Sequence, residues 1–392
     1  MQTITLTQRA EKRLKSGHLW IFSNEIDAAK TDLKVIKDGE QVAVCNSGGK
    51  IFAHAMMNPK ALICGRIVGR KTPFGKKALR GRLVNALALR EAAFDAPCYR
   101  LVYAEGDYLP GLIIDRYNDV CVVQVNSLGM AEYIEEIANI LMHIMPLKGV
   151  LFRNDGASRK QEGFEMAENQ IFGEVSETVE ITENGTRFLV PVLEGQKTGW
   201  FYDHRDNRAK IAALSKGKRV LDVFSYAGGW GLQCLTAGAQ SLTAVDASGF
   251  ALDCLEENAA LNGFAETVTC IEGKAFEAME ALIASGEKYD VVILDPPAFI
   301  KKKKDFNSGS KAYKKVNELG LRLLEKDGLL VAGSCSMHMP DSALQDAVQL
   351  AARHTDRELS LVYRGGHAAD HPIHPAIKET EYLKAQIYLR RG

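Results

Sequence analysis

The second half of the chain alternates apolar strands with helices, and this pattern constrains the fold more than any other feature of the sequence. From about residue 190, seven short apolar runs, among them KRVLDVFS, SLTAVDAS and YDVVILDPP, alternate with segments of helical periodicity. Near-continuous apolar strands separated by helices predict an α/β fold, a parallel sheet with helices on both faces. The last two runs lack a long helix between them, so we expect the doubly wound, Rossmann-like sheet to end in an antiparallel hairpin.

The first half of the chain is organised differently. Its first ~70 residues form short β-like runs, and EQVAVCNSGGKIFAHAMMN predicts a hairpin around residues 47–49. Residues 75–94 have helical spacing and a basic face, which predicts a connecting helix. The segment that follows mixes strands with one helix. We therefore expect three domains: a small β-rich module (1–72), a middle α+β domain with the connecting helix (73–188) and the Rossmann-like domain (189–392).

Charge is distributed unevenly along a chain whose net charge is zero. Residues 1–90 hold 17 Lys/Arg and 6 Asp/Glu. A basic module on a neutral protein favours a polyanionic partner, most simply nucleic acid, although solvated surface lysines would give the same count. No apolar run reaches the ~20 residues of a membrane span, and the N-terminus lacks the apolar core of a signal peptide. We expect a cytoplasmic protein with no membrane partner.

Two of the predicted strands end in residues suited to a nucleoside cofactor. Ligands of such sheets bind at the carboxyl ends of the strands. Asp222 is followed by a turn with Gly228, Gly229 and Gly231, where glycines would let backbone amides approach a ligand closely. The spacing is not GxGxxG, which disfavours a dinucleotide. Asp246 ends the next strand, where an acid can bind both ribose hydroxyls. Together these features predict a cofactor such as S-adenosylmethionine.

A fourth strand ends in DPPAF, residues 295–299. Two prolines stop both helix and strand, so Asp295 is expected at the strand tip, where its carboxylate can accept from an exocyclic amine. Phe299 could stack on a flat base. The run Lys301–Lys304 that follows is either a phosphate grip at the rim of the site, with Lys301 and Lys302 nearest the loop, or a solvated charge run.

The fifth strand runs into Ser-Cys-Ser, residues 334–336. A cysteine at a strand tip near lysines can have a lowered pKa and act as a thiolate, whereas small residues at such tips are also common packing choices. Methylation of the C5 carbon of a pyrimidine requires such a nucleophile at C6. The other seven cysteines lack this setting, and none forms a CxxC pair or has a histidine at zinc spacing, so we expect free thiols and no metal.

The chain resembles, over essentially its whole length, the bacterial large-subunit ribosomal RNA cytosine-C5 methyltransferase family of type I. The matching segments are HLWIFSNEI (18–26), EGDYLPGLIIDRY (105–117), QKTGWFYDHRDNR (196–208), DVFSYAGGWG, LDPPAF, SCS and AADHP (368–372). The resemblance implies an N-terminal PUA domain, 5-methylcytidine in 23S ribosomal RNA as the product, and S-adenosylmethionine as the cofactor. It further implies Cys335 as the nucleophile on cytosine C6, and Asp295 as the group that orients the base.

The resemblance also extends the predicted cofactor site. The aromatic and charged segment 194–208 is expected to close over the cofactor as a lid. Where the family usually has an acid for the adenine amine, this chain has Lys274, which cannot accept that bond, so Glu272 or a backbone carbonyl would have to replace it. The predicted cofactor-binding residues are Asp203, Arg205, Asp222, Phe224, Ser225, Tyr226, Gly228, Asp246, Ala247, Ser248, Asn262, Ala275, Phe276 and Asp295.

Other functions remain open from the sequence. A purine N-methyltransferase would use a similar DPP loop and would not need Cys335. An RNA-binding assembly factor with a decayed methyltransferase domain is supported only by Lys274, and a small-molecule methyltransferase would leave the basic module unexplained. The sequence identifies neither the target nucleotide nor the base that removes the C5 proton, and it does not decide between a monomer and a homodimer.

Overall fold

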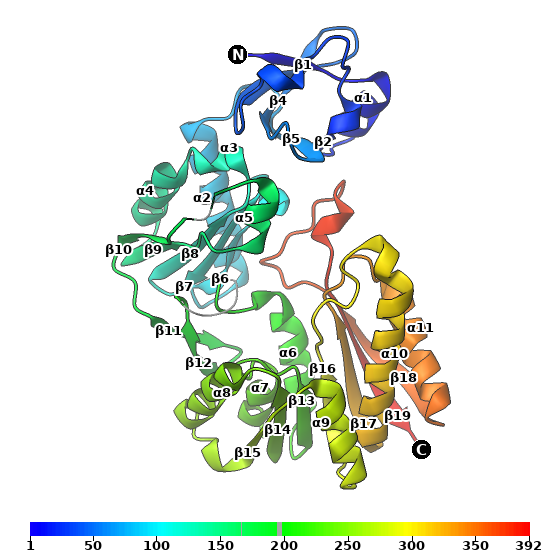
Figure 1. Ribbon diagram of the computed structural model, residues 1–392. Helices are drawn as coiled ribbons and strands as arrows, with labels where there is room; N and C mark the ends of the chain where they lie inside the picture. The colour runs from blue at the N-terminus through cyan, green and yellow to red at the C-terminus, as the bar shows by residue number, and fades with distance from the viewer. Residues whose placement is uncertain (166, 194–197) are drawn as a thin grey trace. The chain divides into compact units, whose positions relative to one another are not determined.

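The computed structural model describes residues 1–165, 167–193 and 198–392, and its contacts divide the chain into two units. Unit 1 comprises Met1–Val179, Pro191–Tyr202 and Ala369–Thr380. Unit 2 comprises Glu180–Val190, Asp203–Ala368 and Glu381–Gly392. Residues 194–197, which begin the predicted lid, lie outside the described residues. Figure 1 gives the order of the elements along the chain.

The N-terminal part of unit 1 is a five-stranded sheet of order β1-β3-β4-β5-β2. The predicted hairpin is present, because β3 and β4 pair antiparallel on either side of residues 46–50. A short helix that the sequence analysis did not predict follows β1 and buries only Ala10 and Leu14. The elements are β1 (Thr3–Thr5), α1 (Gln8–Lys15), β2 (Trp20–Phe22), β3 (Gln41–Cys45), β4 (Ile51–Met57) and β5 (Ile63–Gly69).

The rest of unit 1 is built around a second five-stranded sheet, of order β10-β9-β8-β7-β6. The predicted connecting helix α2 lies against helix α4, and both contribute to the core of this sheet. The elements are α2 (Lys76–Ala93), β6 (Cys98–Tyr103), β7 (Leu112–Tyr117), β8 (Val120–Val125), α3 (Leu128–Ala131), α4 (Ile134–Ile144), β9 (Gly149–Phe152), α5 (Ala157–Glu162) and β10 (Gln170–Gly173).

A separate two-stranded sheet follows, formed by β11 (Thr178–Glu183) and β12 (Thr186–Pro191). Residues 187–191 of the apolar run RFLVPV lie in β12. Most of this hairpin has its contacts in unit 2, since Glu180–Val190 belongs to that unit. Its Asn184 donates to the Arg205 carbonyl and to Gln233.

Unit 2 is the predicted doubly wound domain. Its seven-stranded sheet has the order β15-β14-β13-β16-β17-β19-β18, parallel except for β19, which runs antiparallel to both of its neighbours. The strands are β13 (Arg219–Val223), β14 (Ser241–Asp246), β15 (Val268–Glu272), β16 (Tyr289–Leu294), β17 (Leu324–Ser334), β18 (Glu358–Gly365) and β19 (Lys384–Arg391). The last two strands pair as expected, but the connection between them is long and contains Ala369–Thr380 of unit 1.

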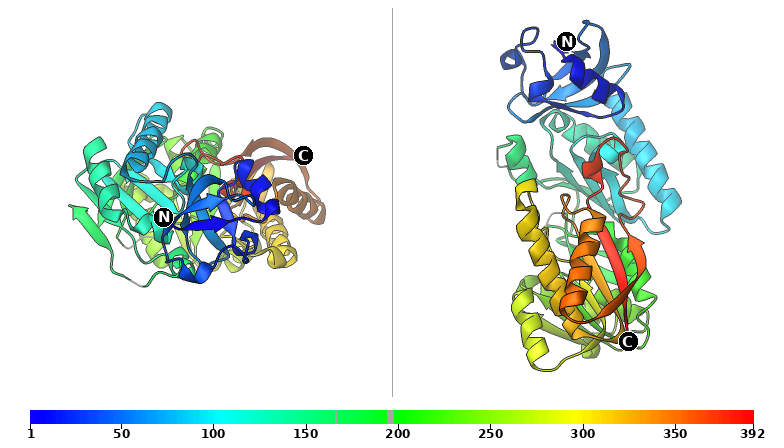
Figure 2. Two further views of the ribbon diagram at one scale, coloured as in Figure 1. Left: turned by 90° about the horizontal axis from the view of Figure 1, so that it is seen from above. Right: turned by 90° about the vertical axis from the view of Figure 1, so that its right-hand side faces the viewer.

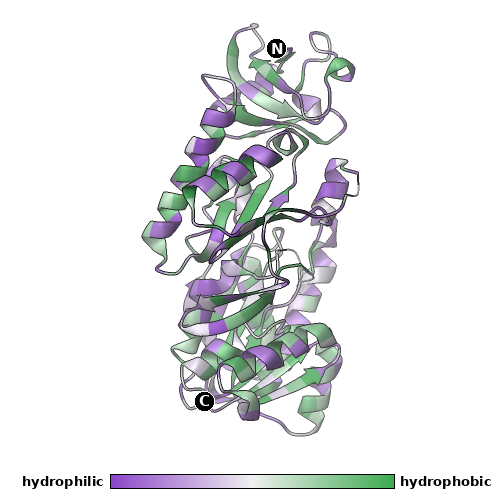
Figure 3. Ribbon diagram, turned by 90° about the vertical axis from the view of Figure 1, so that its left-hand side faces the viewer, coloured by the Kyte–Doolittle hydropathy of each residue, from purple (hydrophilic) through white to green (hydrophobic). Residues whose placement is uncertain are grey.

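Helices cover both faces of this sheet. On one face α9, α10 and α11 lie side by side, and on the other α7 contacts α6 (Figures 1 and 2). The helix ribbons alternate hydrophilic and hydrophobic residues, as expected where one side of a helix is buried (Figure 3). The helices are α6 (Arg205–Ala212), α7 (Gly231–Thr236), α8 (Gly249–Leu261), α9 (Ala275–Ala284), α10 (Phe306–Leu323) and α11 (Asp341–His354).

Candidate active site

The turn after β13 has an unusual backbone. Phe224 and Tyr226 have φ values of 68° and 47°, in the left-handed region that non-glycine residues rarely adopt. Such residues cost of order 1–3 kcal/mol each and persist where the surrounding structure imposes them. Here the N–H groups of Phe224 and Ser225 both donate to the Val245 carbonyl, at 2.9 and 3.2 Å. The predicted cofactor turn is therefore fastened to the end of β14.

Asp222 lies at the base of this turn and is completely buried. Its Oδ2 accepts the N–H of Gly231 at 3.0 Å, whereas no described residue bonds its Oδ1. Burial, with the nearby charges of Asp295 and Asp246, raises the pKa of Asp222 to about 8, although the Gly231 hydrogen bond acts in the opposite direction. A buried carboxyl oxygen without a partner is suited to a polar group of a ligand.

Two glycines of the turn are required by the packing around them. A Cβ on Gly231 would lie 2.5 Å from Leu242 Cδ1, and a Cβ on Gly228 would lie 2.8 Å from Leu232 Cδ1. Both positions therefore need glycine because α7 packs closely against its neighbours. Gly228 also has a φ of 86°. The approach of their backbone to a ligand stays a prediction.

Asp246 ends β14 and is half-buried. Its Oδ2 accepts the Tyr226 N–H and its Oδ1 accepts the Ser248 N–H, both at 2.9 Å. Each carboxylate oxygen retains a second lone pair, which suits the two hydroxyl donors of a ribose. Ala247 is exposed beside it, and the hydroxyl of Ser248 caps α8 by accepting the Ala251 N–H. The acceptor oxygens of Asp246 therefore fit the ribose of S-adenosylmethionine.

The next strand tip carries the residues predicted near the adenine. Ala275 is buried at the start of α9, and the ring of Phe276 lies 6.3 Å from that of Phe299. Lys274 points to solvent, with its side chain 79% exposed and paired with Glu277. Glu272 instead lies over the start of α8, because a Cβ on Gly249 would be 3.2 Å from its Oε2. An acid is therefore present at this edge, supplied by Glu272.

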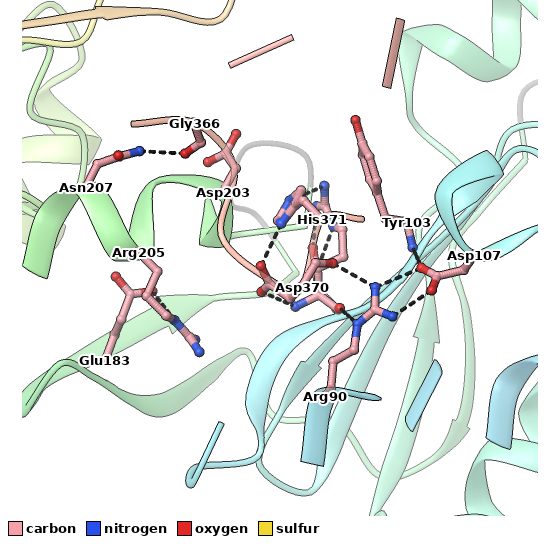
Figure 4. Close-up of polar contacts among 12 residues, drawn as sticks. Arg90, Tyr103, Asp107, Glu183, Asp203, Arg205, Asn207, Gly366, Asp370 and His371 are labelled. Carbon is pink, nitrogen blue, oxygen red and sulfur yellow. Dashed lines mark hydrogen bonds and ion pairs between the residues drawn. The ribbon is translucent and has the colours of Figure 1, made fainter. Parts of the chain in front are cut away.

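Three predicted cofactor residues have other partners. Asn262 lies at the opposite end of α8. Its side chain accepts the Arg187 N–H and donates to the carbonyls of Arg187 and Asn258. Arg205 is buried and pairs with Glu183 (Figure 4). Glu183 also binds Arg208 and Gln233. Asp203 accepts a 2.6 Å hydrogen bond from the Tyr382 hydroxyl.

Asp295 follows β16 directly and is held from two sides. The indole Nε1–H of Trp230 donates to its Oδ2 at 3.0 Å, and Nε2 of His204 lies 3.3 Å from its Oδ1. Burial opposes ionisation, but the charge and hydrogen bond of His204 and the Trp230 donor outweigh it and lower the pKa of Asp295. Asp295 is therefore a hydrogen-bond acceptor at neutral pH.

His204 is in turn oriented by Asn207. The Asn207 side-chain amide donates to the Gly366 carbonyl at 2.8 Å (Figure 4) and lies 3.1 Å from Nδ1 of His204. Because the amide nitrogen is a donor, Nδ1 is the acceptor, and the proton of a neutral His204 is assigned to Nε2, facing Asp295. Neither His204 nor Trp230 was among the predicted site residues, although both lie within the quoted motifs.

Cys335 follows β17 directly and is half-buried. The serines on either side of it both bond the buried hydroxyl of Tyr313 from α10, Ser334 at 2.9 Å and Ser336 at 2.8 Å. The Sγ atom of Cys335 donates instead toward the Pro296 carbonyl, at 3.8 Å. The Oγ of Ser336 also accepts the Ile300 N–H, which links the tips of β16 and β17.

The tips of these two strands bring Asp295 and Cys335 close together. β16 and β17 are parallel neighbours, with Leu294 opposite Ala332. A Cβ on Gly333 would lie 3.0 Å from Oδ1 of Asp295. The ring of Phe299 lies 4.9 Å from that of Tyr313, beside the same two tips. The predicted catalytic pair and the predicted stacking residue therefore share one end of the sheet.

The other cysteines have different environments. Burial raises the pKa of Cys64 to about 11 and that of Cys121, Cys234 and Cys270 to about 12. Cys254 and Cys270 are half-buried like Cys335, but Cys254 is in α8 and Cys270 lies inside β15. Partial exposure alone does not distinguish Cys335; its place at a strand tip does.

The DHP sequence of the predicted tail motif has an anchoring role within unit 1. Arg90, fully buried, forms a bidentate pair with Asp107 and donates to the Asp370 carbonyl at 2.7 Å (Figure 4). Asp370 also accepts the Arg100 N–H at 3.0 Å and contacts His371. These bonds hold the segment Ala369–Thr380 against the middle sheet.

The basic N-terminal module contains a groove of about 580 Å³ next to α1. Its lining includes Arg9, Lys12, Arg13 and His18. Arg13 is paired with Glu25 at 2.5 Å, and burial, with Arg13 nearby, lowers the pKa of His18 to about 4. Lys301 and Lys302 of unit 2 are exposed, and none of Lys301–Lys304 forms an ion pair with a described residue.

The described residues contain neither a cluster of metal ligands nor a helix suited to span a membrane. No group of three or more His, Cys, Asp or Glu side chains in residues 1–165, 167–193 and 198–392 could hold a metal ion. In the same ranges no helix has the length and apolar character to cross a membrane.

The sheet order and the residues at its carboxyl edge define an S-adenosylmethionine-dependent methyltransferase domain. The model of that family matches residues 159–388, and a PUA-like domain model matches residues 4–70. Two solved chains share the fold over 99% of this chain and all of their own length. SMU.776, assigned as a methyltransferase and solved in complex with SAH, has a TM-score of 0.85 and 20% identity. A chain from Streptococcus mutans, assigned as a SAM-dependent methyltransferase, has a TM-score of 0.84 and 20% identity.

Sequence relatives define the family more narrowly. The proteins named Ribosomal RNA large subunit methyltransferase I are 36% identical in Tolumonas auensis, over 98% of both chains, and 36% identical in Vibrio parahaemolyticus, over 97% of both chains. The chain belongs to the ribosomal RNA large subunit methyltransferase I family. Its cofactor is S-adenosylmethionine.

Proposed function

We propose that this protein methylates large-subunit ribosomal RNA, that its product is 5-methylcytidine in 23S RNA, and that Cys335 forms a covalent bond to C6 of the target cytosine. The names of its relatives support ribosomal RNA as the substrate. The observation that carries the C5 assignment is the position of Cys335, a half-buried thiol at the tip of β17 beside the tip of β16. Purine N-methylation would not need such a thiol.

The chain supplies the nucleophile for the reaction of the base. The Cys335 thiolate adds to C6 of the ring. The electrons of the former C5–C6 double bond then form an enamine-like intermediate, in which C5 is nucleophilic. When bound, S-adenosylmethionine supplies the electrophilic methyl group that C5 accepts. Loss of the C5 proton then restores the double bond, and the Sγ–C6 bond breaks to return the thiolate.

Asp295 orients the base in this proposal. Its pKa is lowered, so it is ionised at neutral pH, and Trp230 and His204 each use one lone pair of a different oxygen. The remaining lone pairs can accept the N4 amino hydrogens of cytosine, whereas a uracil carbonyl would meet the negative charge. Phe299 provides a ring for stacking of an unstacked base.

The basic module serves to hold the RNA backbone. The PUA-like match covers residues 4–70, and the groove beside α1 is lined by Arg9, Lys12 and Arg13. Such contacts give salt-dependent affinity with little sequence information. Lys301 and Lys302 are exposed after the DPPAF loop, and we expect them to contact phosphates near the target base.

Nucleoside mass spectrometry of unmodified large-subunit RNA tests the proposal. The RNA is incubated with S-adenosylmethionine and wild-type protein, Cys335→Ala or Cys254→Ala; Cys254 is equally half-buried but lies in α8. We expect 5-methylcytidine with wild type and Cys254→Ala and none with Cys335→Ala. A methylated purine formed by all three proteins would contradict the C5 assignment. A wild-type protein that fails to bind S-adenosylmethionine in calorimetry would contradict the enzyme assignment itself.

A further inference from the structure

Lys384 is a buried lysine at the start of β19, next to the nucleophile. It pairs with Ser334 in the β17–β19 ladder, and only 7% of the residue is exposed. Its Nζ donates to the Ser336 carbonyl at 2.7 Å and to the Tyr382 carbonyl at 2.8 Å. The backbone of Lys384 therefore lies beside the residue before Cys335, while its side chain binds the residue after it.

The surroundings of Lys384 do not explain it as an ordinary ion pair. Its head group contacts two neutral carbonyls, and burying an ammonium without a carboxylate contact is costly. Burial lowers the pKa of Lys384 to about 8, while the charges of Cys335, Asp341 and Glu381 act to raise it. Of these, Asp341 is already bonded by Arg364 and Gln386. An apolar residue in place of Lys384 would avoid this desolvation cost. The presence of a lysine here therefore suggests that its charge has a function.

We propose that Lys384 is a positioning residue for the nucleophile, which holds the Cys335 loop through the Ser336 carbonyl and stabilises the thiolate form of Cys335 by its positive charge. This inference rests on the proposed function of Cys335. The electrostatic effect is reciprocal: a thiolate that favours the ammonium is favoured by it to the same extent. In a partly desolvated site an opposite charge of this kind shifts a pKa by roughly 1–3 units.

Among the described residues, the other titratable groups around Lys384 and the cysteine loop do not supply this charge. Tyr313 from α10 stays neutral, because burial raises the pKa of its hydroxyl. Asp341 from α11 and Glu381 before β19 are acidic and would disfavour a thiolate. Arg364 from β18 is engaged with Asp341. In the part of the chain that the structure describes, Lys384 is thus a cation bonded directly to the cysteine loop.

The rate of alkylation of Cys335 by iodoacetamide tests the inference without RNA or S-adenosylmethionine. The rate is followed by peptide mass spectrometry from pH 5 to pH 9, because only the thiolate reacts readily. We expect Lys384→Gln and Lys384→Met to raise the midpoint for Cys335 by roughly one pH unit, and Lys384→Arg to return it toward the wild-type value. Alkylation of Cys254 in the same samples is the internal reference and should not shift.

The variants separate charge from hydrogen bonding and folding. Lys384→Gln retains N–H donors for the two carbonyls, so it decides the question if Lys384→Met does not fold. A wild-type midpoint in a folded neutral variant would overturn the inference. That result leaves the role of Cys335 intact, whereas 5-methylcytidine formation by Cys335→Ala would refute the proposed function.

Discussion

The hydroxyl of Tyr313 provides a sharp test of how the nucleophile is held. Tyr313 is fully buried, and its hydroxyl bonds the Oγ atoms of Ser334 and Ser336 at 2.9 and 2.8 Å. Tyr313→Phe removes this one oxygen and keeps the ring, which packs 4.9 Å from the ring of Phe299. The change therefore removes two hydrogen bonds of the Cys335 loop with little change in packing.

The expected magnitudes follow from these contacts. Each hydrogen bond contributes about 0.5–1.5 kcal/mol, and Ser336 retains the Ile300 N–H as a second partner. We expect Tyr313→Phe to lower the free energy of unfolding by about 1–3 kcal/mol. Misplacement of a reacting group by 1 Å costs on the order of 100-fold in rate, so we expect kcat for methyl transfer to fall about 10- to 100-fold. KM for RNA should change little, because Tyr313 is not placed to contact the RNA backbone.

The assay compares this variant with Tyr388→Phe in β19. The Tyr388 hydroxyl donates to Oε1 of Gln386 at 2.5 Å, and the residue is 4% exposed, so the control loses a buried hydroxyl away from the cysteine loop. Urea unfolding gives the stability of both variants, and methyl transfer gives the rates. We expect both to be destabilised and only Tyr313→Phe to be slow. Equal rates for the two variants, or a wild-type rate for Tyr313→Phe, would refute the reasoning.

Two further predictions concern the cofactor turn. Burial raises the pKa of Asp222 to about 8. Between about pH 4 and pH 8 the folded state therefore binds a proton that the unfolded state releases. The free energy of unfolding falls as pH rises through this window. Urea unfolding should show a slope of about 1 kcal/mol per pH unit that Asp222→Asn lacks; parallel curves would contradict it. Gly231→Ala should cost about 1–3 kcal/mol, because its Cβ would lie 2.5 Å from Leu242. Gly273→Ala, whose Cβ meets nothing within 4 Å, is the control and should be close to neutral.

The sequence predicted the elements whose pattern is local. Apolar runs and helical periodicity predicted the doubly wound sheet, and the hairpin around residues 46–50 follows from its glycines. Helix α1 was missed because it buries only Ala10 and Leu14 and is otherwise charged, which weakens the apolar pattern on which the prediction depends. The hairpin of β11 and β12, joined by a two-residue turn at Asn184 and Gly185, spans the predicted domain boundary at residue 188, and most of it has its contacts in unit 2.

The support of the site depends on contacts between residues far apart in the chain. Trp230 reaches Asp295 across 65 positions, and Lys384 reaches Ser336 across 48. No local pattern encodes such a pair, so the sequence indicated Asp295 and Cys335 at strand tips without the groups that hold them. Asn262 shows the converse: a position expected to contact the cofactor instead fastens α8 to β12.

The carboxyl edge of the sheet needs these long-range bonds for a physical reason. The β-ladder ends where the reactive groups begin, and beyond it the strand tips are joined by a few backbone hydrogen bonds, such as those of Phe224 and Ser225 to the Val245 carbonyl. Side chains add further bonds: Asp246 bonds the turn after β13, Ser336 bonds the loop after β16, and Lys384 bonds the segment after β17. Each of these bonds joins a side chain on one strand end to the backbone of the adjacent one. The same serines that left Cys335 ambiguous in the sequence are therefore the residues that fix it in place.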